Sequence, residues 1–192
     1  MGKKYLEKSK TAIPIKRLPF VKLFSANDHI LDVGCGGGRD AKFFTQHGLK
    51  ATGIDVSPVL INLAKKEAKK ASFKCVDLLK MNFPKETFDG IWAEAVLLHL
   101  KRKDVPRAIK EFYEVLKPSG ILHIGVRKGR GEMYEKEKLT GEYERFYTYF
   151  SQKEIKFMLK KQGFKVFSSE ILPDMHKRRN ISWIEIWARK KV

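Results

Sequence analysis

The sequence predicts an α/β domain built around a mostly parallel β-sheet. Short apolar runs typical of buried strands alternate with amphipathic stretches typical of helices, and this order produces parallel sheets covered by helices. A glycine cluster lies between one such strand and the helix that follows it. The 192 residues contain no repeat and no linker, so we expect a single domain over 1–192, with an N-terminal helical segment at 1–28.

Each expected element has a local signal. Ser57 and Ser151 are expected to be helix N-caps, the first followed by a proline and the second paired with Glu154 in a capping box. Gly163 is expected to end the last helix. A turn is expected at 118–120, and the last two strands should form an antiparallel pair. Strands are expected at 29–33, 50–54, 73–76, 88–94, 121–126, 164–172 and 181–188, and helices at 13–24, 39–47, 58–70, 105–116 and 152–162.

The segment 127–147 is polar, and charges of both signs alternate along it. We therefore expect a mobile loop there that acts as a lid beside the site. Tyr147 and Tyr149 either line an acceptor pocket beneath it or pack the lid itself.

Composition excludes several classes of protein. Two cysteines cannot form a disulfide framework, which indicates a reducing, cytoplasmic setting. The chain has neither an apolar stretch of about 18 residues nor an apolar N-terminal core, so we expect no membrane span and no signal peptide. The net charge of +18 would attract nucleic acid, but the lysines are dispersed, which favours a solvated surface.

The glycine cluster and two acidic residues point to one kind of ligand. Gly34, Gly36 and Gly38 allow a tight turn and a close approach of a ligand to the backbone. Asp32, just before them, would repel a pyrophosphate and attract an ammonium group. Asp55 ends the second strand, where an acidic side chain binds ribose hydroxyls. A ribose with a cationic amino-acid portion and no phosphate describes S-adenosylmethionine.

Four motifs in order resemble those of class I S-adenosylmethionine-dependent methyltransferases. They are Asp32-Val-Gly-Cys-Gly-Gly-Gly38, Gly53-Ile-Asp-Val-Ser57, Phe88-Asp-Gly-Ile-Trp92 and Leu116-Lys-Pro-Ser-Gly-Ile-Leu122. The resemblance covers about 30–126 and implies a Rossmann-like three-layer αβα domain. The implied sheet has seven strands in the order 3-2-1-4-5-7-6, with strand 7 antiparallel. Ser119 departs from the glycine common in the family, which concerns only a turn.

The resemblance also implies roles for single residues. Asp55 would accept hydrogen bonds from the ribose, and Val56 would pack on the adenine. Asp77 would receive the adenine amino group, although a helix cap explains it equally well, and Leu78 would supply a backbone contact. The methionine portion would lie against the loop and the end of the fourth strand, which means Asp32, Gly34, Cys35, Gly36, Gly38, Ala93 and Glu94.

Two residues are candidates for a general base. Glu94 ends a central strand, where open α/β sheets bind ligands, but it could instead only complement a cationic ligand. His99 is the other candidate because histidine side chains ordinarily titrate near neutrality, yet a histidine among leucines is more often a packed core residue. His29, His123 and His176 form no recognisable ligand set, so we expect no metal.

Three functions remain open at this point. The first is a methyltransferase for a small-molecule acceptor, as a monomer or homodimer. The second is an RNA (tRNA) methyltransferase, favoured by the charge and the basic run 176–179. The Asn/Asp-Pro-Pro-Tyr/Phe motif of amino-group methylation in nucleic acids is missing after the fourth strand. The third is a non-catalytic protein that binds S-adenosylmethionine, which the intact glycine loop disfavours.

Overall fold

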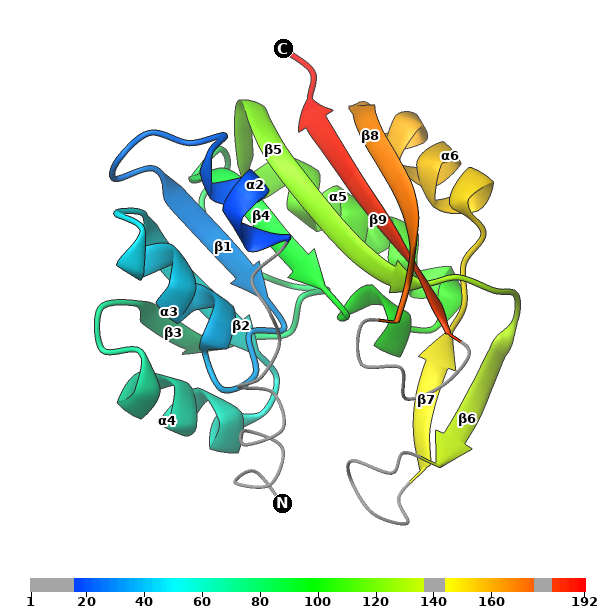
Figure 1. Cartoon of the computed structure of the whole chain (residues 1–192), viewed down its shortest axis with the longest axis horizontal. Helices are drawn as coiled ribbons and strands as arrows, with labels where there is room; N and C mark the ends of the chain where they lie inside the picture. Colours follow the sequence, from blue (N-terminus) through cyan, green and yellow to red (C-terminus); the bar gives the residue numbers. More distant parts are fainter. Residues whose placement is uncertain (1–15, 137–143, 175–180) are drawn as a thin grey trace.

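The fold has three layers, with a seven-stranded sheet in the middle (Figure 1). A computed structural model describes residues 16–136, 144–174 and 181–192. The strands of the large sheet are β1 His29–Val33, β2 Lys50–Asp55, β3 Ser72–Cys75, β4 Phe88–Glu94, β5 Leu116–Arg127, β8 Phe164–Pro173 and β9 Ser182–Lys190.

The strand order of this sheet is β3-β2-β1-β4-β5-β9-β8. Strand β9 runs antiparallel to both β5 and β8, while the β1–β2, β1–β4, β2–β3 and β4–β5 pairs are parallel. Because β8 and β9 are the sixth and seventh strands of the large sheet, the predicted order 3-2-1-4-5-7-6 with an antiparallel strand 7 is confirmed. The chain order reverses between β1 and β4, and open α/β sheets bind their ligands beside the carboxyl ends of the strands at such a point.

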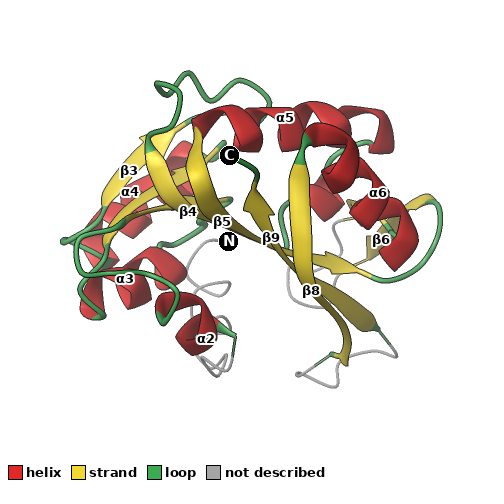
Figure 2. Ribbon diagram, turned by 90° about the horizontal axis from the view of Figure 1, so that it is seen from above, coloured by secondary structure: helices red, strands yellow, loops and turns green. Residues whose placement is uncertain are grey.

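Helices cover both faces of the sheet. α2 (Arg17–Val21), α3 (Arg39–Gln46) and α4 (Pro58–Glu67) share one apolar core with the first face. α5 (Val105–Val115) and α6 (Gln152–Gln162) share another with the second face. Figure 2 shows α2 and α3 on the opposite side of the sheet from α5 and α6. No described helix is long and apolar enough to cross a bilayer.

The predicted helix signals are confirmed in detail. The Ser57 side chain accepts a hydrogen bond from the Leu60 amide at the start of α4. Ser151 and Glu154 form the reciprocal capping box of α6, and Gly163 ends that helix in the left-handed conformation, with φ 106°. These helix-end signals in the local sequence agree with the overall fold, as expected for a sequence with few competing structures.

Two element boundaries were wrong. In place of a helix over 13–24, the described part is the short α2, and residues 13–15 lie outside the described residues. The turn predicted at 118–120 is a bulge inside a longer β5. There the β4 pairing moves from Leu116 opposite Phe88 to Ile121 opposite Gly90, with Ser119 at φ 62°. With this bulge, β5 begins directly after α5, without a separate loop.

The segment 127–147 is not the loop that its polar composition suggested. β6 (Glu132–Lys136) and β7 (Glu144–Thr148) pair as an antiparallel hairpin, and 137–143 lie outside the described residues. Arg127 lies 3.8 Å above the Tyr147 ring, and its guanidinium donates to Glu135 at 3.3 Å. Charged and aromatic contacts thus anchor an element that has little apolar surface. Its role as a lid stays a prediction.

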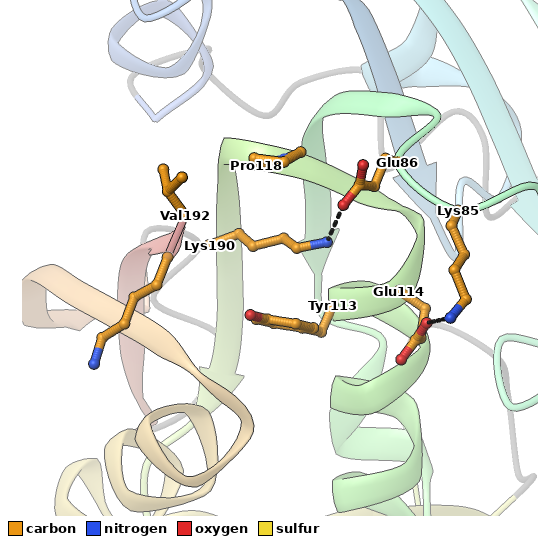
Figure 3. Close-up of a pocket in the computed structure, with 8 residues that line it drawn as sticks. Lys85, Glu86, Tyr113, Glu114, Pro118, Lys190 and Val192 are labelled. Atoms are coloured by element: carbon orange, nitrogen blue, oxygen red, sulfur yellow. Dashed lines mark hydrogen bonds and ion pairs between the residues drawn. The ribbon is translucent and has the colours of Figure 1, made fainter.

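Figure 1 shows this hairpin beyond the carboxyl end of β5. Two hollows in the described surface lie at the opposite edge, where strands begin. One, between β5, α5 and the end of β9, is lined by Tyr113, Glu86 and Lys190 (Figure 3). Lys190 donates there to Glu86 and to the Leu116 carbonyl, so its ammonium is already hydrogen-bonded within the wall of this hollow. The other lies beside His29 and Thr52, at the start of β1 and in β2.

Candidate functional site

The glycine loop follows β1 at the point where the strand order reverses. Gly34, Gly36 and Gly38 all have positive φ, at 70°, 53° and 79°. A Cβ on Gly34 would lie 2.7 Å from the Val96 side chain, and one on Gly38 would lie 2.9 Å from the Phe73 ring. The turn prediction for Gly34 agrees with this geometry. Gly38 also allows close packing against Phe73 of β3 and Ala64 of α4, and its contact with a ligand stays a prediction.

Asp55 at the end of β2 holds the loop in place. One carboxylate oxygen accepts from the Gly36 amide at 3.0 Å, and the other accepts from the Ser57 amide at 2.9 Å. Each carboxylate oxygen can accept a further hydrogen bond. A ligand with vicinal hydroxyls could therefore bind to a carboxylate already oriented by two backbone amides.

Asp32 and Cys35 are buried beneath the loop. Asp32 is 2% exposed and accepts from the Ala41 amide in α3 at 3.0 Å. Burial and the neighbouring Asp40 raise the pKa of Asp32 well above its ordinary value. Burial likewise raises the pKa of the Cys35 thiol. Both side chains support the loop from inside, so neither presents a charge at the described surface.

The predicted adenine contacts lie along the ends of β2 and β3. Val56 is 65% exposed, unusual for a valine beside a core strand, and offers an apolar surface for a flat ring. Asp77 is exposed, and its carboxylate accepts from the Leu79 amide at 2.9 Å within a turn; no helix starts there, so the helix-cap interpretation is wrong. Leu78 is buried at 8% exposure, so its backbone is the part available to a ligand.

Glu94 ends β4 and belongs to a polar cluster of four side chains that the sequence analysis did not assemble. Its Oε1 accepts from the Lys16 ammonium at 3.3 Å, and Lys16 also donates to Glu185. The imidazole of His123 donates through Nε2 to Glu185 Oε2 at 2.9 Å, since an ionised carboxylate can only accept. One network of hydrogen bonds and ion pairs, here called the carboxylate cluster, therefore joins Glu94, His123, Glu185 and Lys16.

The strand register brings the carboxylate cluster together. Glu94 on β4 lies opposite Gly125 on β5, which lies opposite Glu185 on β9. Neighbours across a sheet point to the same face. A Cβ on Gly125 would lie 1.9 Å from Glu94 Oε2, so only glycine leaves room for this carboxylate. Ala93, the residue before it, is fully buried in the opposite core.

The two carboxyl groups of the cluster have opposite pKa shifts. Burial and the nearby charge of Glu185 raise the pKa of Glu94. Burial would also raise that of Glu185, but the hydrogen bond from His123 together with the charge of Lys16 holds the pKa of Glu185 below its ordinary value. Of the two carboxyl groups, Glu94 is therefore the one better suited to exchange a proton.

His99 is held by the β6–β7 hairpin. Its Nδ1 lies 3.0 Å from the Phe146 carbonyl, which it can reach only as a donor, and its Nε2 lies 3.1 Å from an Arg145 guanidinium nitrogen. The ring also packs against Tyr147, with centroids 5.0 Å apart. Tyr147 is 1% exposed, so it packs the base of the hairpin and does not line a pocket in this arrangement. Both ring nitrogens of His99 therefore have structural partners.

Sequence reasoning missed Lys16 and Glu185, and it dismissed His123. Ligand-type atoms of Glu94, His123 and Glu185 lie within 4.8 Å of one another, so a possible ligand set does exist here, with Lys16 as the cation beside it. A signal for Glu185 was present. It is the single charge within the apolar run 183–187, on the same side of β9 as two tryptophans.

Comparisons with known proteins place this site in context. A model of the methyltransferase domain matches residues 31–124. A ubiquinone biosynthesis O-methyltransferase of Coxiella burnetii is 36% identical over 98 residues, 49% of this chain and 41% of that protein. A phosphoethanolamine N-methyltransferase of Plasmodium falciparum is 28% identical over 127 residues, 64% of this chain and 47% of that protein. The chain thus spans less than half the length of these two relatives.

A solved structure matches nearly the whole chain. It is a SAM-dependent methyltransferase of Methanosarcina mazei, with a TM-score of 0.81 and 25% identity. The match covers 94% of this chain and 99% of that one. The similarity therefore extends beyond the glycine loop to the strands that carry Glu94 and Glu185.

Proposed function

Because the chain belongs to the class I S-adenosylmethionine-dependent methyltransferases, we propose that it transfers the methyl group of this cofactor to a small-molecule acceptor. One observation carries the proposal: Asp55 and the glycine loop form a pre-oriented cradle beside the carboxyl ends of β1 and β4. The relatives named above act on small molecules, as their names state, which supports an acceptor of that class.

The residues fit the cofactor at three places. Asp55 can accept from the ribose hydroxyls, the exposed Val56 can cover one face of the adenine, and the glycine loop would border the methionine portion. Asp32 lies beneath the glycine loop and supports it by accepting a hydrogen bond from the Ala41 amide at the start of α3. Asp77 and Leu78 complete the adenine end in this proposal, and Ala93 contributes backbone.

S-adenosylmethionine supplies a sulfonium-activated methyl group, so the protein has only to align the acceptor, exclude water and remove a proton where the acceptor carries one. Glu94 is the candidate for proton removal, because it ends β4 beside the loop and has a raised pKa. Its Lys16 partner holds the carboxylate in place. His99 positions the hairpin instead.

Cofactor binding tests the proposal. We expect Asp55→Ala to weaken binding of S-adenosylhomocysteine by about 1.5–3 kcal/mol, the range for hydrogen bonds to a charged partner. Gly36→Val should weaken it more, because the residue needs a positive φ of 53°. Calorimetric titration gives the affinities, with Glu67→Ala on the exposed face of α4 as the control. Wild-type affinity in both site variants, with the fold intact, would place the cofactor elsewhere.

The structural role of His99 leads to a second expected result. His99→Asn should lower the free energy of unfolding by about 1–3 kcal/mol, since its half-buried partners on the hairpin, Phe146 and Arg145, lose their hydrogen bonds. Turnover at saturating cofactor should stay within a few-fold of wild type. Urea unfolding and S-adenosylhomocysteine release measure the two effects, with the exposed His47→Asn as the control. A stable His99→Asn protein without turnover would make the histidine the base.

RNA is the second candidate acceptor, and the net charge of +18 is the observation that favours it. The basic run 176–179 that the sequence analysis singled out lies outside the described residues. A gel shift with tRNA at increasing salt separates the two acceptor classes, because phosphate contacts weaken steeply with salt. Tight, salt-sensitive binding together with methylation of the RNA would favour this second function.

A further inference from the structure

The carboxylate cluster contains a cation from the protein itself. The Lys16 ammonium lies between Glu94 and Glu185 and 5.7 Å from the centre of the Trp183 ring. Two carboxylates and an aromatic face are the groups that bind ammonium ions in proteins. Lys16 thus shows that an ammonium group fits this position.

The hydrogen-bond donors at this position do not match the acceptors. With its proton on Nε2, His123 presents the Nδ1 lone pair as an acceptor, and the Glu94 Oε2 acceptor lies 4.0 Å away. Both atoms are buried, and neither has a hydrogen-bond partner within the described part of the chain. His123 itself is 0% exposed. Buried polar atoms without partners are rare and indicate a missing ligand or water.

Glu94 Oε2 and His123 Nδ1 both lack a hydrogen-bond donor in the described part of the chain. With a neutral His123, the two carboxylates also carry one negative charge more than the Lys16 ammonium compensates. Among the residues that the structure describes, the ammonium paired with both carboxylates is that of Lys16, which is tied to the start of α2 and reaches only the Oε1 atoms. An ammonium that is not tethered to the backbone could lie deeper and donate to Glu94 Oε2 and His123 Nδ1 as well. An anionic or acceptor-only group would add a further unsatisfied contact.

We propose that the acceptor of this enzyme carries a primary ammonium group, and that this group binds in the carboxylate cluster in place of Lys16. The lysine withdraws by rotating its flexible four-carbon stem. Its ammonium keeps the two buried carboxylates compensated until the acceptor arrives. The proposal rests on the proposed function, since it names the chemical class of the acceptor.

The test measures binding of n-butylamine and of 1-butanol, which share a carbon skeleton, to the full chain saturated with S-adenosylhomocysteine. Wild-type protein should bind the amine at least tenfold more tightly than the alcohol. Lys16→Ala should bind the amine at least tenfold more tightly than wild type does, because no internal ammonium competes. Lys22→Ala, an exposed lysine at the other end of α2, should leave both affinities unchanged.

Two further variants keep the test decisive. Glu185→Gln retains an acceptor for His123 and should remove the gain seen in Lys16→Ala. Trp183→Leu should weaken amine binding without touching a charge, and thermal midpoints of all variants report folding. Equal affinities for amine and alcohol would overturn the proposal. So would tight binding of zinc or magnesium chloride that Glu185→Gln abolishes, because the cluster would then be a metal site.

The same titrations separate this inference from the proposed function. If S-adenosylhomocysteine binds but the amine shows no preference over the alcohol, the acceptor class is wrong and the methyltransferase function stands. If the amine binds selectively but no variant or wild-type protein binds S-adenosylhomocysteine, the proposed function fails, and the acceptor role fails with it.

Discussion

Exchange of Glu94 for glutamine is expected to lower turnover by about 100- to 10,000-fold, the usual effect of removing a general base. An ammonium acceptor must lose a proton before its nitrogen can attack the methyl group, and Glu94 is the carboxyl group of the cluster with the raised pKa. Glutamine keeps the size of the side chain, so the thermal midpoint should change little. Release of S-adenosylhomocysteine at saturating cofactor measures the loss.

The matched control is Glu114→Gln, a partly exposed glutamate of α5 paired with Lys85 at the opposite edge of the sheet. It should leave turnover unchanged. The pH profile provides a further check, since a base must be deprotonated to act. The wild-type rate should rise with pH through a pKa above the ordinary value for glutamate. Full turnover in Glu94→Gln would mean that the carboxylate only complements a cationic ligand.

Substitution of Gly125 by alanine is expected to remove activity to the same extent without changing any ionisable group. The added Cβ would lie 1.9 Å from Glu94 Oε2 and 2.6 Å from its Cδ, so the Glu94 carboxylate must move away from its position over Gly125 of β5. We expect a loss of turnover of about 100-fold or more, as for the base itself. Overpacking should cost about 1–3 kcal/mol of stability.

A double variant tests whether both changes act through one group. Gly125→Ala combined with Glu94→Gln should lose no more turnover than the worse single variant, because the same carboxylate is removed twice. Gly120→Ala is the control on the same strand, since its Cβ would meet the Leu116 side chain at 2.7 Å, far from the cluster. Additive losses in the double variant would separate Gly125 from Glu94.

Local patterns in the sequence were enough to predict the sheet and its caps. Ser57, Ser151 and Gly163 each stand where backbone groups at a helix end need a partner or a left-handed residue, so the signal depends on nearest neighbours alone. The glycine loop is also predictable from its neighbours, because Gly34 supplies the positive φ that the turn requires. Patterns within one element cannot show that Gly38 packs against Phe73, which lies on another strand.

The hairpin was missed for a related reason. Its residues 132–136 are mostly polar and exposed, which is typical of loops, whereas Tyr147 and Thr148 on the partner strand are buried. Their anchoring contacts run to distant residues, such as the hydrogen bonds from Arg102 to the Gly131 and Tyr149 carbonyls. Such long-range pairs leave no trace in local hydrophobic periodicity.

The carboxylate cluster was the least predictable part of the site. Lys16 and Glu185 are separated by 169 positions, and His123 and Glu185 by 62. Only the strand order, with β9 inserted beside β5, brings them into contact. The sequence could indicate that Glu94 ends a central strand, but it could not indicate which charges compensate it.

The position of β9 has a consequence for the order in which the protein folds. It lies between β5 and β8 in space, yet the ribosome makes it after every other strand of the sheet. A nascent chain that already contains the glycine loop, Asp55 and Glu94 therefore still lacks Glu185, and it leaves one edge of β5 unpaired and β8 without any neighbouring strand in the sheet. Pairings of such long sequence separation form slowly. Cofactor-binding elements can thus take shape during synthesis, whereas the carboxylate cluster closes only when the last strand inserts.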